Sequence, residues 1–348
     1  LLAEGYRVAV ATQPIEAGGK TWPRGSYVVR VSRNDSTVHD RVDALARESG
    51  VAVSGISSGF PETAQYGVYS EPTVSLVAPR VAIVADEGIS QPAYGAIWWS
   101  FERRYGIAFT PIALGTVATG DLSKYNVILV PDASPAALDT RLGKGGLEHL
   151  KTWLQGGGTL ITMGGATAWA ARESVGLTSA RVVGADEKDT TASAKPAAAD
   201  SARAKKREAE TPDKALETMT PFASPSASNA SPQPLAGTNF EAVLDRTHWL
   251  TFGYSRPRLV ALVSGSTFLK LSKEGTNVAV FPSTGTIRRG GFEWPENTER
   301  LLRGTALVVE EPVGDGHVVL FTNEPMFRGW WRAMDRLVLN GVLLGATF

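Results

Sequence analysis

The sequence predicts an α/β protein built on a doubly wound, mostly parallel sheet, with a small N-terminal α+β segment and a long low-complexity insertion. Three observations lead to this fold class. Short apolar runs without polar alternation recur from Val81 onward, as in strands that are buried on both faces. Segments with helical spacing separate these runs, and glycine or proline punctuates the joins. Strands that alternate with helices favour a parallel sheet covered by helices on both sides.

The bulk composition excludes several classes of protein. Lysine plus arginine and aspartate plus glutamate both total 35 in the 348 residues, so no net charge attracts nucleic acid. The absence of cysteine excludes disulfides, thiolate zinc ligands and cysteine catalysis. No apolar run reaches the roughly 18–20 residues of a direct membrane span. The start at Leu1 lacks methionine and a secretory signal, so we expect a piece of a longer polypeptide.

Residues 1–79 are expected to form a connecting α+β segment. Strands are predicted at Arg7–Ala11 and Gly25–Val31, and helical spacing predicts a helix over Asp40–Ser49. The Gly-, Ser- and Pro-rich stretch Ser54–Ser75 has no period and is predicted to be a loop.

Residues 80–183 are expected to form the first part of the α/β domain. The predicted strands are Val81–Ala85, Ala108–Ile112, Val127–Val130 and Thr159–Met163. The predicted helices are Pro92–Tyr105, Gly145–Gln155 and Thr167–Ser174.

Residues 184–235 are dominated by Ala, Ser, Pro and charged side chains, and such a segment buries too little surface to offset its ordering entropy. We expect a disordered insertion there, and completion of the same domain by residues 236–348. Order is expected to return at Phe240. The predicted elements are strands at Leu259–Leu262, Val278–Phe281, Ala306–Val309 and His317–Thr322, with a closing helix over Arg332–Leu344.

The strand Thr159–Met163 turns sharply through Gly164 into a helix. Such a corner is where many α/β enzymes hold a catalytic nucleophile, yet Gly164 has no side chain to serve as one. Thr162 lies within the strand, and Thr167 begins the helix, where threonine is a favoured N-cap. A hydroxyl nucleophile also needs a base oriented by a third group.

The late strand from His317 offers no such base. Asn323 stands where a partner histidine would be expected, and Glu324 follows it. The predicted site is therefore degenerate, comprising Gly164, Asn323, Glu324 and Glu87 without a catalytic residue. If Gly164 and Asn323 face one another, the pair Gly164→Cys and Asn323→His is expected to give a partly activated thiol. The alternative is an unconventional hydrolase that uses Thr167 or Glu87.

Metal and cofactor motifs are missing from the sequence. The four histidines make no H-E-x-x-H pair, and the glycine-rich stretches lack the spacing of phosphate-binding loops. Each histidine is interpreted as an ordinary surface or structural residue. We therefore expect no metal and no cofactor in this chain.

An aromatic and cationic cluster near the C-terminus gives a possible partner surface: Phe327, Arg328, Trp330 and Trp331. Tryptophan and arginine dominate interface hot spots. The interpretation we favour is a packed entry to the last helix, with arginines stacked on indoles. Trp98 and Trp99 pose the same choice, and core packing is favoured there more clearly.

From Arg80 onward the sequence resembles class I glutamine amidotransferase-like domains. The resemblance rests on Arg80–Asp86, Tyr125–Asp132, Gly156–Ala166 and Gly314–Glu324. It implies an elbow nucleophile at Gly164 and a histidine at Asn323, and both are absent. Amidotransferase activity is therefore not expected.

The match is closer to the amidotransferase-like C-terminal domain of bacterial zinc carboxypeptidase-like (carboxypeptidase A-type) proteins. It rests on Pro79–Gly88, Asn126–Asp132, Gly314–Phe321 and Pro325–Gly329. The resemblance implies a secreted or periplasmic zinc metallocarboxypeptidase as the parent, with zinc in an upstream peptidase domain. This chain itself is expected to be a pseudoenzyme or accessory domain whose partner is that peptidase domain or another protein subunit.

Overall fold

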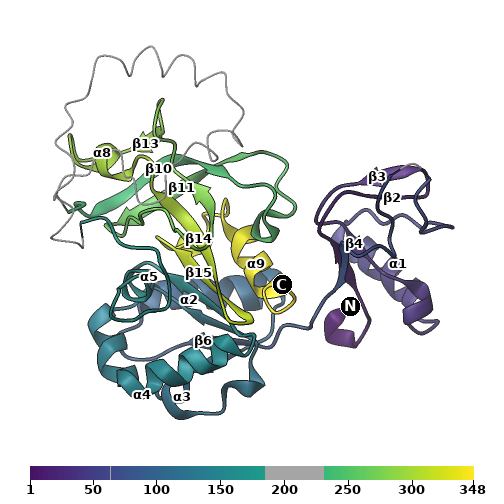
Figure 1. The fold of residues 1–348 in the computed structure, drawn as a ribbon, viewed down its shortest axis with the longest axis horizontal. Coiled ribbons are helices and arrows are strands. Elements are labelled where there is room, and N and C mark those ends of the chain that lie inside the picture. Colours follow the sequence, from purple (N-terminus) through teal and green to yellow (C-terminus); the bar gives the residue numbers. More distant parts are fainter. Residues whose placement is uncertain (63, 185–230) are drawn as a thin grey trace. The chain divides into compact units, whose positions relative to one another are not determined.

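The computed structural model describes residues 1–62, 64–184 and 231–348, which form two compact units (Figure 1). The smaller unit comprises residues 1–78 together with 346–348, and the larger unit comprises residues 79–345. Most of the expected insertion at 184–235 lies outside the described residues.

The smaller unit contains two small antiparallel sheets and one longer helix. The elements are η1 (Leu2–Glu4), β1 (Ala9–Ala11), β2 (Ile15–Ala17), β3 (Lys20–Trp22), β4 (Tyr27–Val28), η2 (Val31–Arg33), α1 (Val38–Ser49) and β5 (Thr73–Ser75). The strand order β4-β1-β5 makes one sheet, and the hairpin β2-β3 makes the other. A small core forms under the hairpin from Ala11, Ile15, Ala17 and Val68.

Two local signals shape this unit. Helix α1 ends at Gly50, whose left-handed φ of 70° suits glycine. The predicted loop Ser54–Ser75 is wrong at its end, because Val74 pairs with Val10 as part of β5. Three residues of strand beside a polar stretch leave little period to detect.

The larger unit is built on a ten-stranded sheet with the order β11-β10-β12-β14-β15-β9-β8-β6-β7, and β13 pairs with β10 (Figure 1). Its strands are β6 (Val81–Val84), β7 (Phe109–Ile112), β8 (Val127–Val130), β9 (Thr159–Met163), β10 (Leu235–Leu244), β11 (Arg258–Gly265), β12 (Thr276–Val280), β13 (Arg288–Gly291), β14 (Ala306–Val313) and β15 (Gly316–Phe321).

Five neighbouring strands of this sheet, β7, β6, β8, β9 and β15, run parallel. Numbered in chain order they lie as 2-1-3-4-5, which is the flavodoxin-like, doubly wound arrangement. The predicted α/β fold class is confirmed. From β14 outward the remaining strands pair antiparallel, beginning with the hairpin that joins β14 to β15 through Gly314.

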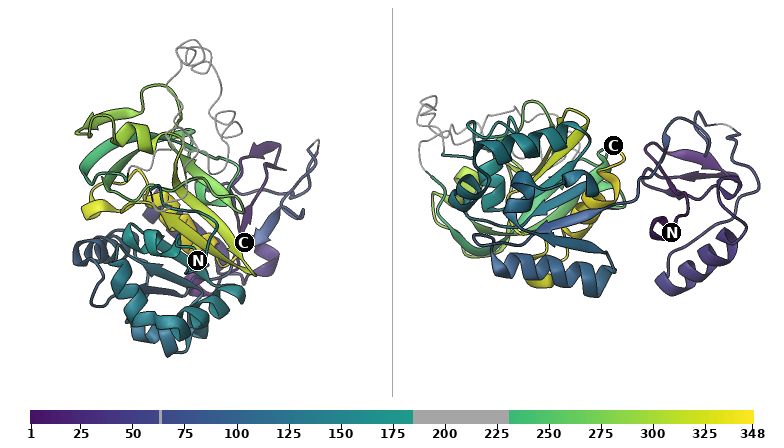
Figure 2. Two further views of the ribbon diagram at one scale, coloured as in Figure 1. Left: turned by 60° about the vertical axis from the view of Figure 1, so that its left-hand side comes forward. Right: turned by 90° about the horizontal axis from the view of Figure 1, so that it is seen from below.

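Helices cover both faces of the sheet (Figure 2). The helices are α2 (Gln91–Trp99), η3 (Ser100–Tyr105, a π-helix), α3 (Leu114–Thr119), η4 (Leu122–Lys124), α4 (Pro135–Gln155), α5 (Gly165–Ala170), η5 (Trp249–Thr251), α8 (Thr298–Leu302), η6 (Phe327–Gly329) and α9 (Asp335–Leu344). Helix α4 begins at Pro135 rather than Gly145, because proline suits the first helical position, and the helix then kinks at Gly143.

The core divides between the two faces. On one face, Leu138 and Leu154 of α4 pack with Ile128 and Leu160 of the sheet. On the other face, Gly341 lets α9 approach the sheet, because a Cβ built there lies 2.9 Å from Cδ1 of Ile161. Burial of these apolar strands contributes most of the driving force for the fold.

Strand β7 forms one edge of the sheet and contains Pro111. The carbonyl of the next residue, Ile112, points towards the sheet and accepts a hydrogen bond from the Ala85 N–H at 2.8 Å. Because successive residues of a strand alternate, the nitrogen of Pro111 faces outward, where proline is tolerated.

Candidate functional site

The parallel strands β6, β8, β9 and β15 all end at one edge of the sheet. In a flavodoxin-like sheet, ligands bind outside the carboxyl ends of the strands, at the switch point between the first and third strands in chain order. That point lies here between β6 and β8. The residues that follow the four strands are Asp86, Asp132, Gly164 and the pair Asn323 and Glu324. This edge is the candidate functional site.

The elbow after β9 has the sharp geometry that the sequence predicts. Gly164 adopts φ 54° and ψ −118°, and its N–H donates to the Phe321 carbonyl at 3.0 Å. Helix α5 spans Gly165–Ala170, with Gly164 at its N-cap. The prediction that Thr167 begins a helix ending at Ser174 is therefore wrong, because the glycine conformation starts the helix earlier.

Asp132 occupies the space above the elbow. Its Oδ1 accepts a hydrogen bond from the Gly165 N–H at 2.7 Å. A Cβ built on Gly164 would lie 2.4 Å from that same oxygen, closer than real Cβ contacts come. A side chain at Gly164 would therefore require the Asp132 carboxylate to move and a residue other than glycine to adopt φ 54°, and the engineered cysteine there stays a prediction.

Asn323 does not serve as a stand-in for a catalytic base. The residue is buried, and its Nδ2 donates to the Leu262 carbonyl of β11. The pairing of engineered side chains at Gly164 and Asn323 stays a prediction, and the present Asn323 side chain is bonded to β11 rather than to the elbow.

The two threonine hydroxyls at the elbow lie inside the protein. Thr162 Oγ1 and Thr167 Oγ1 are 2.8 Å apart, and both residues are fully buried. One hydroxyl donates to the other, and this hydrogen bond stabilises the join between β9 and α5. Thr167 is not placed to attack a substrate.

The acidic residues after β6 are engaged locally. Asp86 accepts hydrogen bonds from the N–H groups of Glu87 at 2.7 Å and Leu114 at 2.9 Å, and these bonds lower its pKa. The Glu87 side chain is 84% exposed and pairs with Arg141 of α4. Such exposed pairs contribute little to stability, and Glu87 has an ordinary surface environment.

The carboxyl group of Glu324 at this edge has a raised pKa. Burial is the main cause, the nearby Asp132 carboxylate adds to it, and Arg328 opposes it. The structure thus brings together Glu324, Asp132 and Arg328, whereas Glu87 pairs with Arg141 instead. Two carboxyl groups and a guanidinium can bind and orient polar groups, and this group of three contains neither a hydroxyl nor a thiol.

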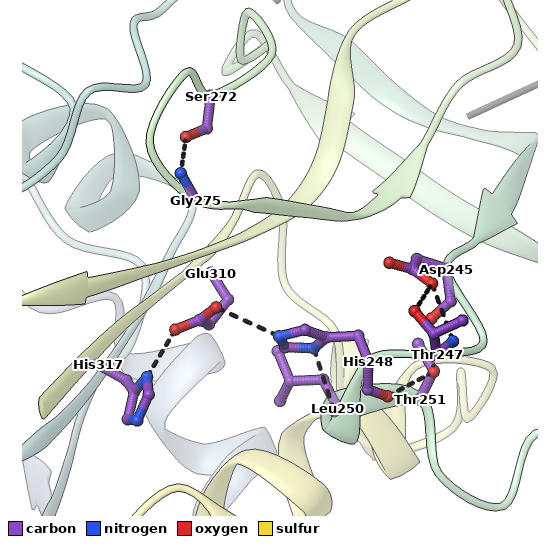
Figure 3. A network of polar contacts seen from close by, with 9 residues as sticks. All are labelled: Asp245, Thr247, His248, Leu250, Thr251, Ser272, Gly275, Glu310 and His317. Atoms are coloured by element: carbon purple, nitrogen blue, oxygen red, sulfur yellow. Dashed lines mark hydrogen bonds and ion pairs between the residues drawn. The ribbon is translucent and has the colours of Figure 1, made fainter. Parts of the chain in front are cut away.

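A second polar cluster joins strands β14 and β15 to the residue before η5 (Figure 3). Glu310 of β14 accepts from His317 Nδ1 at 2.6 Å, and its other oxygen lies 3.2 Å from His248 Nε2. His248 Nδ1 accepts from the Leu250 N–H at 3.3 Å, which leaves the proton of the neutral ring on Nε2, facing Glu310. Burial alone would raise the pKa of Glu310, but the two imidazole hydrogen bonds outweigh it and lower the pKa to about 2.

Sequence reasoning treated these histidines one at a time and missed this cluster. His248 and Glu310 are 62 residues apart, so no spacing signal connects them. Within the described ranges, no group of three or more His, Cys, Asp or Glu side chains is arranged to hold a metal ion. No helix in the same ranges is long and apolar enough to cross a membrane.

The aromatic cluster near the C-terminus is more exposed than the favoured interpretation requires. Trp330 is 59% exposed and stands perpendicular to Trp331, with ring centroids 5.5 Å apart. Arg328 stacks on Phe327 at 5.1 Å rather than on an indole.

Core packing is also the wrong interpretation for two tryptophans of α2. Trp98 and Trp99 are 39% and 42% exposed, while Ile97 and Phe101 fill the core beneath them. Helical periodicity allows only part of each turn to face the sheet, and the smaller apolar side chains take those positions.

Comparison with known proteins gives similarity at the level of structure. No family model and no curated protein matches the sequence. A ThuA-like protein from Parabacteroides merdae is 11% identical, with a TM-score of 0.45, covering 78% of this chain and 91% of the other. A ThuA-like protein from Bacteroides uniformis is 12% identical, with a TM-score of 0.40 and coverage of 76% and 90%. A glutamine amidotransferase from Thermotoga maritima is 8% identical, with a TM-score of 0.40 and coverage of 78% and 99%.

Proposed function

We propose that this chain is a non-catalytic, amidotransferase-like module forming the C-terminal portion of a zinc-carboxypeptidase-like protein. Its role there is to stabilise the peptidase domain, shape substrate access or bind a partner. The observation that carries the non-catalytic role is the carboxylate of Asp132, which lies over the elbow and accepts the Gly165 N–H.

The Asp132 carboxylate lies against both the oxyanion donor and the nucleophile position of an elbow site. The N–H after the elbow residue is the donor that stabilises the oxyanion in α/β-hydrolase sites. Here that donor is bonded to Asp132, and the negative charge of a carboxylate opposes a developing oxyanion. The position of the nucleophile itself is Gly164, where a Cβ would lie 2.4 Å from Asp132 Oδ1 and the carboxylate would have to move to admit a side chain.

The parentage is supported by the order of sequence segments that resemble zinc carboxypeptidase-like proteins, from Pro79–Gly88 to Pro325–Gly329. Zinc then belongs to an upstream peptidase domain, and the protein is periplasmic or secreted. The partner of this module is that peptidase domain or another protein subunit.

The second candidate function is an accessory subunit of a larger assembly. The exposed side chains of Trp99 and Trp330 favour it, because large exposed indoles are typical of binding surfaces. A hydrolase based on Thr167 or Glu87 is less well supported, since the first is buried against Thr162 and the second is an exposed partner of Arg141.

The test measures glutaminase and carboxypeptidase activity of the purified chain, with and without added zinc, beside an Asp132→Ala variant. Both proteins should be inactive. Turnover by the wild-type chain that disappears in Asp132→Ala would overturn the non-catalytic role. The parentage is tested separately by the coding sequence upstream, which should contain an H-x-x-E motif with a distant histidine.

A further inference from the structure

One surface of the larger unit combines exposed indoles with arginines. Trp99 belongs to α2 and Arg104 to η3. Arg328 belongs to η6, and Trp330 directly follows η6. These four residues form the Trp99–Trp330 patch. Trp99 and Trp330 are 42% and 59% exposed. Exposed tryptophans that lie together on a soluble protein are typical of a binding surface.

The two halves of the patch are in direct contact. Gly329 packs on the indole of Trp99 so closely that a Cβ built there lies 2.9 Å from Cε3. Arg104 lies over the same indole, with its guanidinium carbon 4.7 Å from the ring centroid. Its Nη2 also donates to the Gly329 carbonyl at 2.7 Å. Arg104 therefore fixes η6 against α2.

A buried network supports the patch from below. Arg104 Nη1 lies 3.5 Å from Asp335 Oδ2, which also accepts from the Tyr105 hydroxyl at 2.5 Å. Asp335 is buried at the first position of α9. The patch is thus held rigid by three elements, and a preorganised surface loses little conformational entropy on binding.

The backbone at the centre of the patch is strained. Arg328 has φ 50°, followed by φ 69° at Gly329, so two consecutive residues are left-handed. A left-handed residue other than glycine is energetically costly and persists where its surroundings impose it. Such positions concentrate at ligand clamps and binding sites. Here the strained turn directs an arginine and an indole to the surface.

The charge around the patch is positive. Arg328 is exposed and makes no ion pair with any residue of the described ranges, and Arg332 is exposed beside it. Of the neighbouring acids, Asp335 is buried and paired with Arg104, while Glu324 is half-buried and is attracted by Arg328. Glu102 pairs with the exposed Arg103 at 3.7 Å. The exposed groups therefore complement a negatively charged partner.

We propose that the Trp99–Trp330 patch binds an acidic protein segment that also carries aromatic or large apolar side chains. Arginines would pair with its carboxylates, and the two indoles would contact its apolar groups. This inference deepens the proposed partner-binding role by naming the chemistry of the partner.

The experiment measures binding of the full chain to a glutamate–tyrosine copolymer by calorimetry at two salt concentrations. Two variants probe the patch. Trp330→Ala removes an exposed indole, and Arg328→Gly removes the guanidinium while suiting the left-handed backbone, so it retains the fold. Trp294→Ala is the matched control, because Trp294 is 40% exposed and lies outside the patch.

We expect the copolymer to bind and its affinity to fall with salt. Each patch variant should weaken binding about tenfold or more, and the control should leave it unchanged. Absence of binding, or equal loss in Trp294→Ala, would overturn the proposal. Binding of phosphatidylglycerol vesicles but not copolymer would assign the patch to a membrane instead, and self-association abolished by Trp330→Ala would assign it to a second copy. The binding measurement does not depend on an activity assay. Detection of catalytic turnover would therefore refute the non-catalytic role and would leave the binding proposal unaffected.

Discussion

The Oδ1 atom of Asp132 lies 2.7 Å from the backbone nitrogen of Gly165, so one side chain joins the end of β8 to the start of α5. This bond closes the corner between neighbouring parallel strands. It also places a negative charge beside Glu324, whose pKa is raised mainly by burial and further by Asp132.

Replacing Asp132 should therefore affect both stability and titration. Asp132→Ala leaves the Gly165 N–H without its acceptor and should lower the free energy of unfolding by about 1–2 kcal/mol. Asp132→Asn keeps an acceptor and should cost less. Both changes should lower the pKa of Glu324, which NMR titration of the carboxyl carbon measures. An unchanged Glu324 pKa in both variants would contradict the proximity of the two carboxyl groups.

A side chain at Gly164 should be strongly destabilising. Gly164→Ala meets Asp132 at 2.4 Å and forces a left-handed residue, so we expect a loss of about 2–4 kcal/mol in urea unfolding. Gly145→Ala is the matched control, because a Cβ there meets nothing within 4 Å and alanine favours the α4 helix. The control should be neutral or stabilising. Combining Gly164→Ala with Asp132→Ala should recover part of the loss, and strict additivity would refute the steric cause.

Glu310 should make the larger unit acid-sensitive. Its folded pKa of about 2 lies below its ordinary value of 4.5, so its stabilising contribution is present above pH 4.5 and is lost as the pH falls towards 2. The difference corresponds to roughly 3 kcal/mol. Glu310→Gln should lose most of this at neutral pH and show a flatter dependence of unfolding free energy on pH. Glu87→Gln, at an exposed carboxylate, should follow the wild-type curve.

The phenol of Tyr105 should matter for the anchoring of α9. Tyr105→Phe removes the hydroxyl that donates to Asp335 at 2.5 Å and leaves a buried carboxylate with fewer donors. We expect a loss of about 1–3 kcal/mol in unfolding free energy. The control is Tyr94→Phe, because the Tyr94 hydroxyl has no hydrogen bond with the described residues. Equal effects of the two changes would show that the ring, and not the hydroxyl, carries the contact.

The parallel half of the sheet could be predicted closely from the sequence. Val127–Val130 and Thr159–Met163 were predicted with the bounds that the structure has, because strands buried on both faces leave uninterrupted apolar runs. Strand β13 could not be found in this way. Its sequence, Arg-Arg-Gly-Gly, pairs with β10 through the backbone and has no apolar face.

Strand β14 shows why charged residues mislead such reasoning. The predicted strand stopped at Val309, yet β14 continues through Glu310 and Glu311, which are both buried. Glu311 accepts hydrogen bonds from the Ser179 N–H and from the Ser272 hydroxyl. These hydrogen-bond partners of the buried carboxylate are distant in the sequence. The residues adjacent to Glu311 therefore give no sign that its carboxylate can be buried.

At the candidate site, the elbow could be located from the sequence, but the Asp132 carboxylate above it could not. Gly164 was predicted as the turn, because glycine between a strand and a helix marks a sharp corner. In the sequence, Asp132 stood out only as the last residue of the segment Tyr125–Asp132 that resembles amidotransferase-like domains. Its position over Gly164 follows from the pairing of β8 with β9, which composition and periodicity do not specify.

The proline in the edge strand β7 limits the pairing of a further strand with this sheet. An edge strand offers free N–H and C=O groups, and another chain can add to it and seed aggregation. At Pro111 the outward-facing nitrogen has no hydrogen to donate, so an incoming strand would lose a ladder bond in the middle of a four-residue edge. Strand addition at β7 is thereby discouraged, and association with another protein at this edge must rely on side chains.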